Sequence, residues 1–444
     1  MVTSWAQSRN SSKSLEQVAT GEARFAAMPV VKTTFVGREG IGNPIDEWRI
    51  NKKNTVEMLS SLYSIVRSNL INVTKQRFTT TSCATQHQTT RRIFVSIVTG
   101  PSSYCLDMDN QQTPEILIVG AGAVGAFYGS RLAAAAARVS CICRSNYDVA
   151  KSTGFTIKSP YYGSYQFLPT AVYRTVQEAA LSNTFDYVLV ATKSLPDFEN
   201  IPETIAPAIK APNTAVVLLQ NGVGVEQPYR AAFPNNPIIS AVEYVSASQN
   251  NGLVIHNKWT RICLGNYYSP PRPQGVNAQR DARGIYLAQK LVDIFQAGGV
   301  QDAQFWEDIS LARWHKVALN AAFNASAILT GGLTNADMVR DPVLRQHLKD
   351  VMDEIMTAAP KIIGKTFPRE LAPADAILKS TERNEGSKPS MLLDFESGKA
   401  LEIETILGEP ARIARRHGLV LPRTESLYAL LRPYNAKLLQ KAKF

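Results

Sequence analysis

The chain has 444 residues, of which 45% are hydrophobic and 19% charged, enough for two or three domains with a large core. No apolar run approaches the roughly 18 residues of a membrane span, and the formal net charge of +11 comes from dispersed basic residues without a nucleic-acid-binding motif. We therefore expect neither membrane nor nucleic acid as a partner. Five Cys and five His show neither a disulfide framework nor metal-ligand spacing, so no metal site is expected.

Residues 1–112 differ in composition from the rest of the chain. They are rich in Ser, Thr, Asn and Gln, and no acidic residue lies between Glu57 and Asp107. Such a basic, hydroxyl-rich composition is typical of a mitochondrial presequence, although here it begins near Met58. Either translation starts at Met58 and the product is imported, or the leader does not belong to the working protein and Met108 is the natural start. We predict a low-complexity, disordered leader and favour a cytoplasmic over a mitochondrial location.

A glycine-rich turn follows the first strong strand pattern. The apolar run Ile116–Val119 leads directly into Gly120-Ala121-Gly122-Ala123-Val124-Gly125, and a helical pattern follows. Glycines at this spacing let the backbone turn tightly and approach a pyrophosphate at a helix N-terminus. The alternative is a glycine-rich turn without a ligand, since this motif alone is a weak signal.

The end of the next strand indicates which dinucleotide would bind. Arg144 follows the predicted strand Val139–Cys143, at a position where an NAD site usually carries Asp or Glu for the ribose 2′-hydroxyl. An Arg suits a 2′-phosphate instead, so the sequence predicts NADP(H) as the cofactor.

Further strand patterns alternate with helical stretches and predict a parallel, doubly wound sheet. They are Tyr187–Thr192, Ala215–Leu219 and Ile238–Val242. Lys193 and Asn221 come directly after two of these strands, where open α/β sheets bind their ligands, so both are predicted to contact the cofactor. Residues 266–283 are predicted as a surface loop and Ile285–Phe295 as a helix.

After Trp306 the strand patterns end. Leu311–Leu329, Pro342–Ile363 and Leu401–His417 have helical patterns. The predicted architecture is therefore an α/β Rossmann-type NADP-binding domain, residues 113–306, followed by an all-α C-terminal domain, residues 307–444. A cleft between two such domains is the usual place for a substrate.

Three polar residues share one face of the first of these helices. Lys316, Asn320 and Asn324 stand at i, i+4 and i+8 among apolar neighbours. A Lys can protonate the alkoxide that develops when a ketone accepts hydride, and amides orient hydroxyls and carbonyls. The alternative is an ordinary exposed stripe. Downstream, Ser390 near a helix start could bind a substrate carboxylate, whereas Glu402 by itself is more typical of a solvated residue.

From about Pro114 to Tyr434 the chain resembles the ketopantoate reductase family. The resemblance rests on short motifs in the family's order: Ile118–Gly125, Cys143-Arg144, Lys193, Gln220-Asn221-Gly222, Arg313–Asn320 with Asn324, Ser390–Asp394, and Glu402.

The resemblance implies a role for each of these positions. Lys316 would be the general acid, Asn320 and Asn324 substrate ligands, and Ser390 the contact to the substrate carboxylate. Asn221 would lie beside the nicotinamide and Glu402 would orient substrate or cofactor; we assign both to cofactor binding.

The implied reaction is the NADPH-dependent reduction of 2-dehydropantoate to (R)-pantoate, on the route to coenzyme A. The expected partner is a small 2-keto acid, with a homodimer left open. Two alternatives are a paralogue that reduces another branched 2-keto acid and a non-catalytic NADP-sensing protein, which would need Arg144 but not Lys316.

Overall fold

The computed structural model describes residues 78–81, 94–98, 103–107, 113–257, 260–268 and 278–442. It divides into two units, 1–112 and 113–444. The described part of the first unit is a three-stranded antiparallel sheet of β1 (Phe78–Thr81), β2 (Phe94–Val98) and β3 (Ser103–Asp107). The sequence analysis predicted no strand in this region. Its two candidate start sites, Met58 and Met108, lie outside the described residues.

The second unit contains an eight-stranded sheet with the order β15-β14-β11-β10-β9-β4-β5-β8. Its strands are β4 (Glu115–Val119), β5 (Arg138–Ile142), β8 (Ala171–Tyr173), β9 (Tyr187–Val190), β10 (Ala215–Leu218), β11 (Ile238–Tyr244), β14 (Arg261–Asn266) and β15 (Asp302–Phe305). The strands from β8 to β11 are parallel, while β14 runs antiparallel to β11. The predicted parallel sheet is confirmed. The strands β14 and β15, which extend this sheet beyond β11, were not predicted from the sequence.

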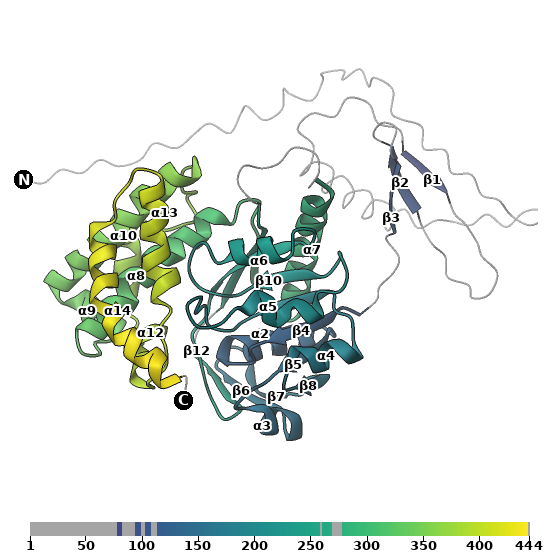
Figure 1. The fold of residues 1–444 in the computed structure, drawn as a ribbon, viewed down its shortest axis with the longest axis horizontal. Helices are drawn as coiled ribbons and strands as arrows, with labels where there is room; N and C mark the ends of the chain where they lie inside the picture. The colour runs from purple at the N-terminus through teal and green to yellow at the C-terminus, as the bar shows by residue number, and fades with distance from the viewer. Residues whose placement is uncertain are drawn as a thin grey trace, which may run out of the picture. The chain divides into compact units, whose positions relative to one another are not determined.

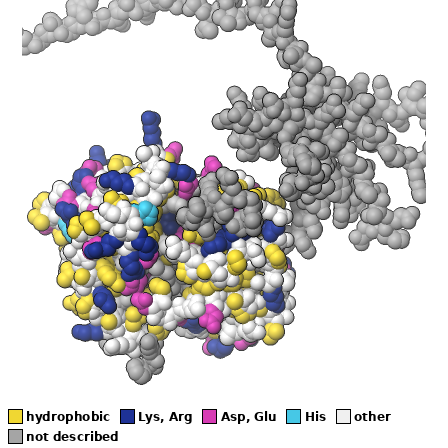
Figure 2. All heavy atoms as spheres, turned by 45° about the horizontal axis from the view of Figure 1, so that its top comes forward, with side chains coloured by type: hydrophobic (Ala, Val, Ile, Leu, Met, Phe, Trp, Pro, Cys, Tyr) yellow, Lys and Arg dark blue, Asp and Glu magenta, His cyan; other side chains and the backbone are white. Residues whose placement is uncertain are grey.

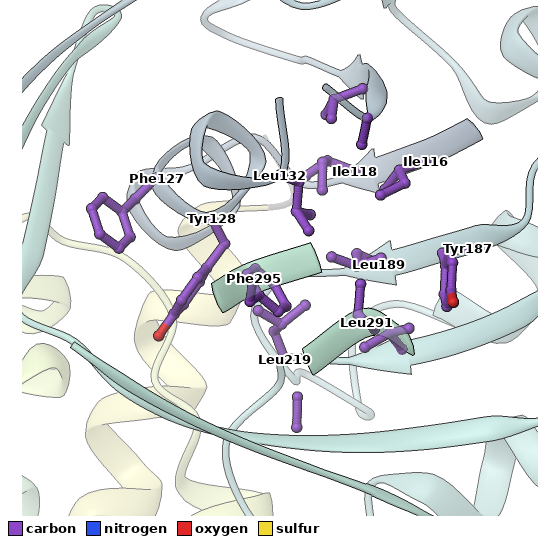
Figure 3. Close-up of a cluster of buried hydrophobic side chains, with 14 of the residues drawn as sticks. Ile116, Ile118, Phe127, Tyr128, Leu132, Tyr187, Leu189, Leu219, Leu291 and Phe295 are labelled. Atoms are coloured by element: carbon purple, nitrogen blue, oxygen red, sulfur yellow. The ribbon is translucent and has the colours of Figure 1, made fainter. Parts of the chain in front are cut away.

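Helices cover both faces of this sheet, which explains why its central strands are apolar throughout. On one face lie α2 (Ala123–Ala134) and α7 (Ala278–Ala297), and on the other α4 (Val176–Ser182), α5 (Ile201–Ile205) and α6 (Glu226–Ala232). In Figure 3, Leu132 of α2 lies beside Ile118 of β4, and the rings of Tyr128 of α2 and Phe295 of α7 meet edge to face.

A smaller sheet with the order β12-β13-β6-β7 packs beside α2. Its strands are β6 (Phe155–Ser159), β7 (Gly163–Phe167), β12 (Ala247–Asn250) and β13 (Leu253–His256), and α3 (Tyr147–Ser152) precedes it. The predicted loop 266–283 is too long at both ends, because Asn266 ends β14 and α7 already begins at Ala278. Residues 269–277 of that loop lie outside the described part.

The C-terminal part is helical, as predicted (Figure 1). Its helices are α8 (Ser310–Leu329), α9 (Asn335–Arg340), α10 (Pro342–Ile363), α11 (Ala374–Thr381), α12 (Ser390–Glu396), α13 (Glu409–Arg416) and α14 (Pro422–Ala442). The predicted helix Leu401–His417 is interrupted, because residues Glu404–Gly408 form a π-helix, η2, before α13. Such π-helical segments are rare and are frequently found at functional sites.

Basic and acidic side chains are interspersed on the surface. On the face shown in Figure 2, Lys and Arg side chains lie scattered among Asp, Glu and hydrophobic side chains instead of forming one basic patch. Across the described ranges, no helix combines the length and the apolar character needed to cross a lipid bilayer. Nor do those ranges bring three or more His, Cys, Asp or Glu side chains together as a metal site would.

The α/β core generates a stability prediction at Leu291. This α7 side chain is fully buried, whereas Tyr286 on the same helix is 56% exposed. Leu291→Ala removes buried methyl groups and leaves a cavity, so it should lower the free energy of unfolding by about 2–5 kcal/mol. Urea unfolding would measure this, and Tyr286→Ala, as the matched control, should change it by no more than about 0.5 kcal/mol. Equal effects of the two substitutions would contradict the packing described here.

Candidate active site

The glycine-rich turn between β4 and α2 has the shape that a dinucleotide requires. Gly120 has φ +96°, and a Cβ on Gly125 would lie 2.2 Å from the Gly120 carbonyl oxygen. A Cβ on Gly122 would meet nothing within 4 Å. Gly120 and Gly125 are thus fixed by the turn itself, while the open side of Gly122 leaves room for a phosphate at the N-terminus of α2. No side chain caps that terminus, so its N–H groups stay available.

Arg144 lies at the end of β5, where its guanidinium is 68% exposed. It donates to both carboxylate oxygens of Glu199, at 2.7 and 3.4 Å. The hydrogen bond that Arg144 donates to Glu199 raises the pKa of Arg144 above its ordinary value. An exposed ion pair contributes no more than about 1 kcal/mol, so a phosphate can displace Glu199 at small cost.

Lys316 lies on α8 and reaches across to strand β11. Its Nζ donates to Oε1 of Glu243 at 2.8 Å, and the two side chains are 15% and 5% exposed. The ammonium also lies 5.9 Å from the centre of the Tyr244 ring. The predicted proton donor is therefore held by a carboxylate that the sequence analysis did not identify.

The two amides on the same face of α8 contact different elements. Asn320 Nδ2 donates to Oδ1 of Asn221 at 3.5 Å, which connects α8 to the turn after β10. Asn324 is buried, and its Oδ1 accepts the backbone N–H of Met391 at 3.2 Å. Asn324 thus holds the first turn of α12, where Ser390 is exposed. Asn324 supports the Ser390 segment in this structure, while Asn320 faces the turn at Asn221.

Lys193 joins the sheet to the helical part. Its Nζ pairs with Asp394 of α12 and lies 3.5 Å from Oε2 of Glu402. Glu402 is buried. Its Oε1 accepts a hydrogen bond from the backbone N–H of Ser194 at 2.9 Å, and its Oε2 accepts one from Asn221 Nδ2 at 3.5 Å. Burial raises the pKa of Asp394 above its ordinary value, with Lys193 opposing that rise. Glu402 is therefore a partner of Lys193 and Asn221, not the solvated residue that its local sequence suggested.

The Asn221-Gly222 turn is locked onto the π-helix. Gly222 has φ +103°, and a Cβ there would lie 2.4 Å from Cβ of Thr405. The next residue, Val223, donates its N–H to the Thr405 carbonyl at 3.1 Å. Only glycine satisfies both the backbone angle and this contact, so the position of Asn221 is set by η2.

Arg313, one turn before Lys316, fixes the start of α8 against the sheet. It is buried, and its Nε lies 2.7 Å from Oε1 of Glu226 and donates to Ser240 Oγ at 2.8 Å. Its Nη1 donates to the carbonyls of both Gln220 and Gly222, at 2.8 and 3.0 Å. This side chain therefore sets the register between Lys316 and the Asn221 turn.

Sequence reasoning missed four residues with defined roles in this arrangement. Glu199, Glu243, Arg313 and Asp394 each pair with or support a predicted site residue. Arg313 and Asp394 stood inside motifs that were recognised, but no role was assigned to them. Glu243 offered one signal, a carboxylate inside the apolar strand Ile238–Tyr244.

A cavity of about 900 Å³ lies away from these residues. It is lined by β15, the start of α8 and the end of α10, including Trp306, Lys361 and Lys365, and contains none of the predicted site residues. The candidate active site is therefore defined by its side-chain network and not by this cavity.

Comparisons with known proteins identify the family of this chain. The family model "Ketopantoate reductase PanE/ApbA" matches residues 116–269, and its C-terminal counterpart matches residues 308–435. The crystal structure of 2-dehydropantoate 2-reductase from Methylococcus capsulatus is 33% identical, with a TM-score of 0.61, over 73% of this chain and 97% of that chain.

The chain belongs to the ketopantoate reductase family.

Two further relatives and one fold neighbour have lower sequence identities to this chain. The 2-dehydropantoate 2-reductase of Nostoc sp. is 27% identical over 71% of this chain and 93% of its own length. An uncharacterized protein of Saccharomyces cerevisiae is 28% identical over 73% of this chain and 95% of its own length. D-mandelate dehydrogenase, solved with NADH and anilino(oxo)acetate, has a TM-score of 0.60 at 20% identity over 73% of this chain and 98% of that chain, which shows a shared fold. The family and the fold predicted from the sequence are thus confirmed, and the chain is an oxidoreductase of this family.

The Arg313 anchor generates the second prediction. Arg313→Met removes one partner of a buried ion pair and leaves the Glu226 carboxylate uncompensated, which should lower the free energy of unfolding by about 3–5 kcal/mol. Arg416 is the control, because its pair with Glu409 is 55% exposed on the Arg side, and Arg416→Met should cost no more than about 1 kcal/mol. Chemical unfolding of both variants would measure these changes in the free energy of unfolding. A loss for Arg313→Met no larger than that of the control would show that the anchor does not hold α8 to the sheet.

Proposed function

We propose that this protein reduces 2-dehydropantoate to (R)-pantoate with NADPH, a step toward coenzyme A. The observation that carries the proposal is the chain of contacts from Asn320 through Asn221 and Glu402 to Lys193, with Lys316 one helical turn before Asn320 on α8. The 33% identity to the Methylococcus capsulatus 2-dehydropantoate 2-reductase supports it.

The residues of the Rossmann-type part fit a dinucleotide. The open side of Gly122 and the uncapped start of α2 would hold the pyrophosphate. Arg144 would pair with the 2′-phosphate in a charge-assisted contact. Lys193 and Asn221, at two neighbouring strand ends, would lie toward the nicotinamide half. When bound, the cofactor supplies the hydride.

The chain's own residues supply the proton and the orientation. Lys316 Nζ would give its proton to the carbonyl oxygen as that oxygen gains charge, and Glu243 keeps the ammonium aimed from α8 toward the strand ends. Asn320 and Ser390 would hold the hydroxyl and carboxylate of the substrate. Positioning of the carbonyl against the hydride donor should contribute at least as much as the proton transfer.

A second candidate is the reduction of another 2-keto compound by the same machinery. The buried Glu243 beside Lys316 supports this second candidate, because a carboxylate next to the proton donor affects which substrates the site accepts. NADPH oxidation with 2-dehydropantoate, measured against a panel of other 2-keto acids, separates the two candidates.

We also propose a cytoplasmic location. Cys141, Cys143 and Cys263 are all free and buried, which supports a reducing compartment.

Replacement of Lys316 tests its role as proton donor. Lys316→Ala should lower kcat by roughly 10²–10⁴-fold, the usual contribution of a general acid, while NADPH still binds. Steady-state kinetics and NADPH fluorescence titration would show this. Lys349→Ala removes a Lys from the surface of α10, where it pairs with Asp353, and should leave kcat unchanged. Near-normal turnover of Lys316→Ala would exclude this residue as the proton donor.

Cofactor choice should depend on Arg144. The unmutated protein should prefer NADPH over NADH, and Arg144→Ala should raise the KM for NADPH far more than it changes kcat or the KM for NADH. The control is Arg138→Ala, at the opposite end of β5, where the guanidinium pairs with Glu115. Equal use of NADPH and NADH by the unmutated protein would contradict the assignment of the 2′-phosphate to Arg144.

A further inference from the structure

The carboxylate of Glu199 occupies the donor groups that the proposed function assigns to a 2′-phosphate. Glu199 follows β9 on the segment that leads into α5, 55 residues along the chain from Arg144. Its two oxygens accept from Nη1 and Nη2 of Arg144 at 2.7 and 3.4 Å, the paired contact through which an Arg also binds a phosphate. The Glu199 side chain is 25% exposed, against 68% for Arg144. Arg144 is therefore open to a ligand, with Glu199 as its anionic partner inside the protein.

Local hydrogen bonds hold Glu199 in this position. Its backbone N–H donates to the carbonyl of Leu195 at 3.0 Å, which closes a tight turn. The next residue, Asn200, caps α5 by accepting the backbone N–H of Glu203. Because Glu199 lies between this turn and the helix start, its carboxylate stays near Arg144 even when a ligand takes its place on the guanidinium.

The pair lies on a segment that is fastened to the glycine-rich turn. Two residues after Arg144, Asn146 Nδ2 donates to the carbonyl of Ala121 at 2.7 Å. The N–H of Ala121 in turn donates to the carbonyl of Ile142, the last residue of β5, at 3.3 Å. In a Rossmann-type site the pyrophosphate lies at this turn and the ribose lies toward the end of the second strand. Arg144 and Glu199 are thus placed together at the ribose end.

The carboxylate acts in opposite directions on the two nicotinamide cofactors. A 2′-phosphate brings acceptor oxygens and negative charge, so it competes with Glu199 for the donors of Arg144 and is repelled by the carboxylate that remains nearby. A 2′-hydroxyl is uncharged and can donate to a carboxylate, which is the contact that an Asp or Glu makes in NAD sites. Arg144 therefore favours NADPH, whereas Glu199 favours NADH at the same position.

We propose that Glu199 is a specificity-determining residue that weakens the preference of this site for NADPH and leaves the site open to NADH as a second cofactor. The inference rests on the proposed function, because it takes Arg144 to face the 2′-position of the cofactor. The carboxylate comes from the segment after β9 and not from the end of β5, where the acidic residue of an NAD site usually stands.

Binding titrations test this role without turnover. The dissociation constants of NADPH and NADH are measured by the fluorescence of the reduced nicotinamide, for the unmutated protein and for Glu199→Gln, which removes only the charge. The substitution should tighten NADPH binding by roughly fivefold and weaken NADH binding by a similar factor, because it removes one charged contact. The NADH-to-NADPH ratio of dissociation constants should therefore rise by at least about tenfold.

The control is Glu203→Gln, which removes one negative charge from the exposed first turn of α5 and should leave the ratio unchanged. If NADPH does not bind the unmutated protein, the proposed function fails. If NADPH binds but NADH does not, or if the rise caused by Glu199→Gln is smaller than expected, the role of Glu199 is overturned while NADPH binding stands.

A second measurement keeps Glu199 and removes its partner. In Arg144→Ala the carboxylate meets the 2′-position alone, so NADH should bind more tightly than NADPH. The double variant Arg144→Ala/Glu199→Gln should lose this order. A preference for NADPH that persists in Arg144→Ala would overturn the inference and leave NADPH as the cofactor, even if Glu199→Gln failed to fold.

Discussion

The buried side chain of Arg313 is the contact on which the geometry of the site depends. Its guanidinium is paired with Glu226 at 2.7 Å and donates to Ser240 and to the carbonyls of Gln220 and Gly222. An Arg presents its donors in a rigid planar fork, so one side chain fixes strand β11 and the turn after β10 relative to α8. Because Lys316 and Asn320 follow on the same helix, their positions relative to Asn221 are set by this anchor.

A second connection closes the site from the other side. Lys193, at the end of β9, reaches Asp394 and Glu402 in the helical part, and the π-helix that follows Glu402 packs on Gly222. The two connections lie on different elements but converge on the same turn. Polar groups that are buried together and fully paired favour one arrangement over its alternatives, and the Asn221 turn is held in this way from both parts of the chain.

The helix α8 illustrates how one sequence pattern serves three contacts. Spacing alone places Lys316, Asn320 and Asn324 on one face, and the structure confirms that all three lie on this helix. Their partners are nevertheless three separate elements: the strand β11, the turn at Asn221 and the start of α12. Asn324 supports a helix start here, a role that periodicity cannot distinguish from a substrate contact, because both need an amide directed inward.

The sequence by itself determined the features that depend on local chemistry. Apolar strands ending in Gly120, Lys193 and Asn221, the helical face of Lys316, and the order of the motifs were sufficient for the fold class and the family, since strand periodicity and turn glycines act over a few residues. The tertiary structure decided the pairings. Glu243 meets Lys316, Glu402 meets Lys193, and Arg144 meets Glu199 across 55 to 209 residues of chain. Contacts at such separations arise from the packing of whole layers, and no local pattern specifies which buried charge will face which.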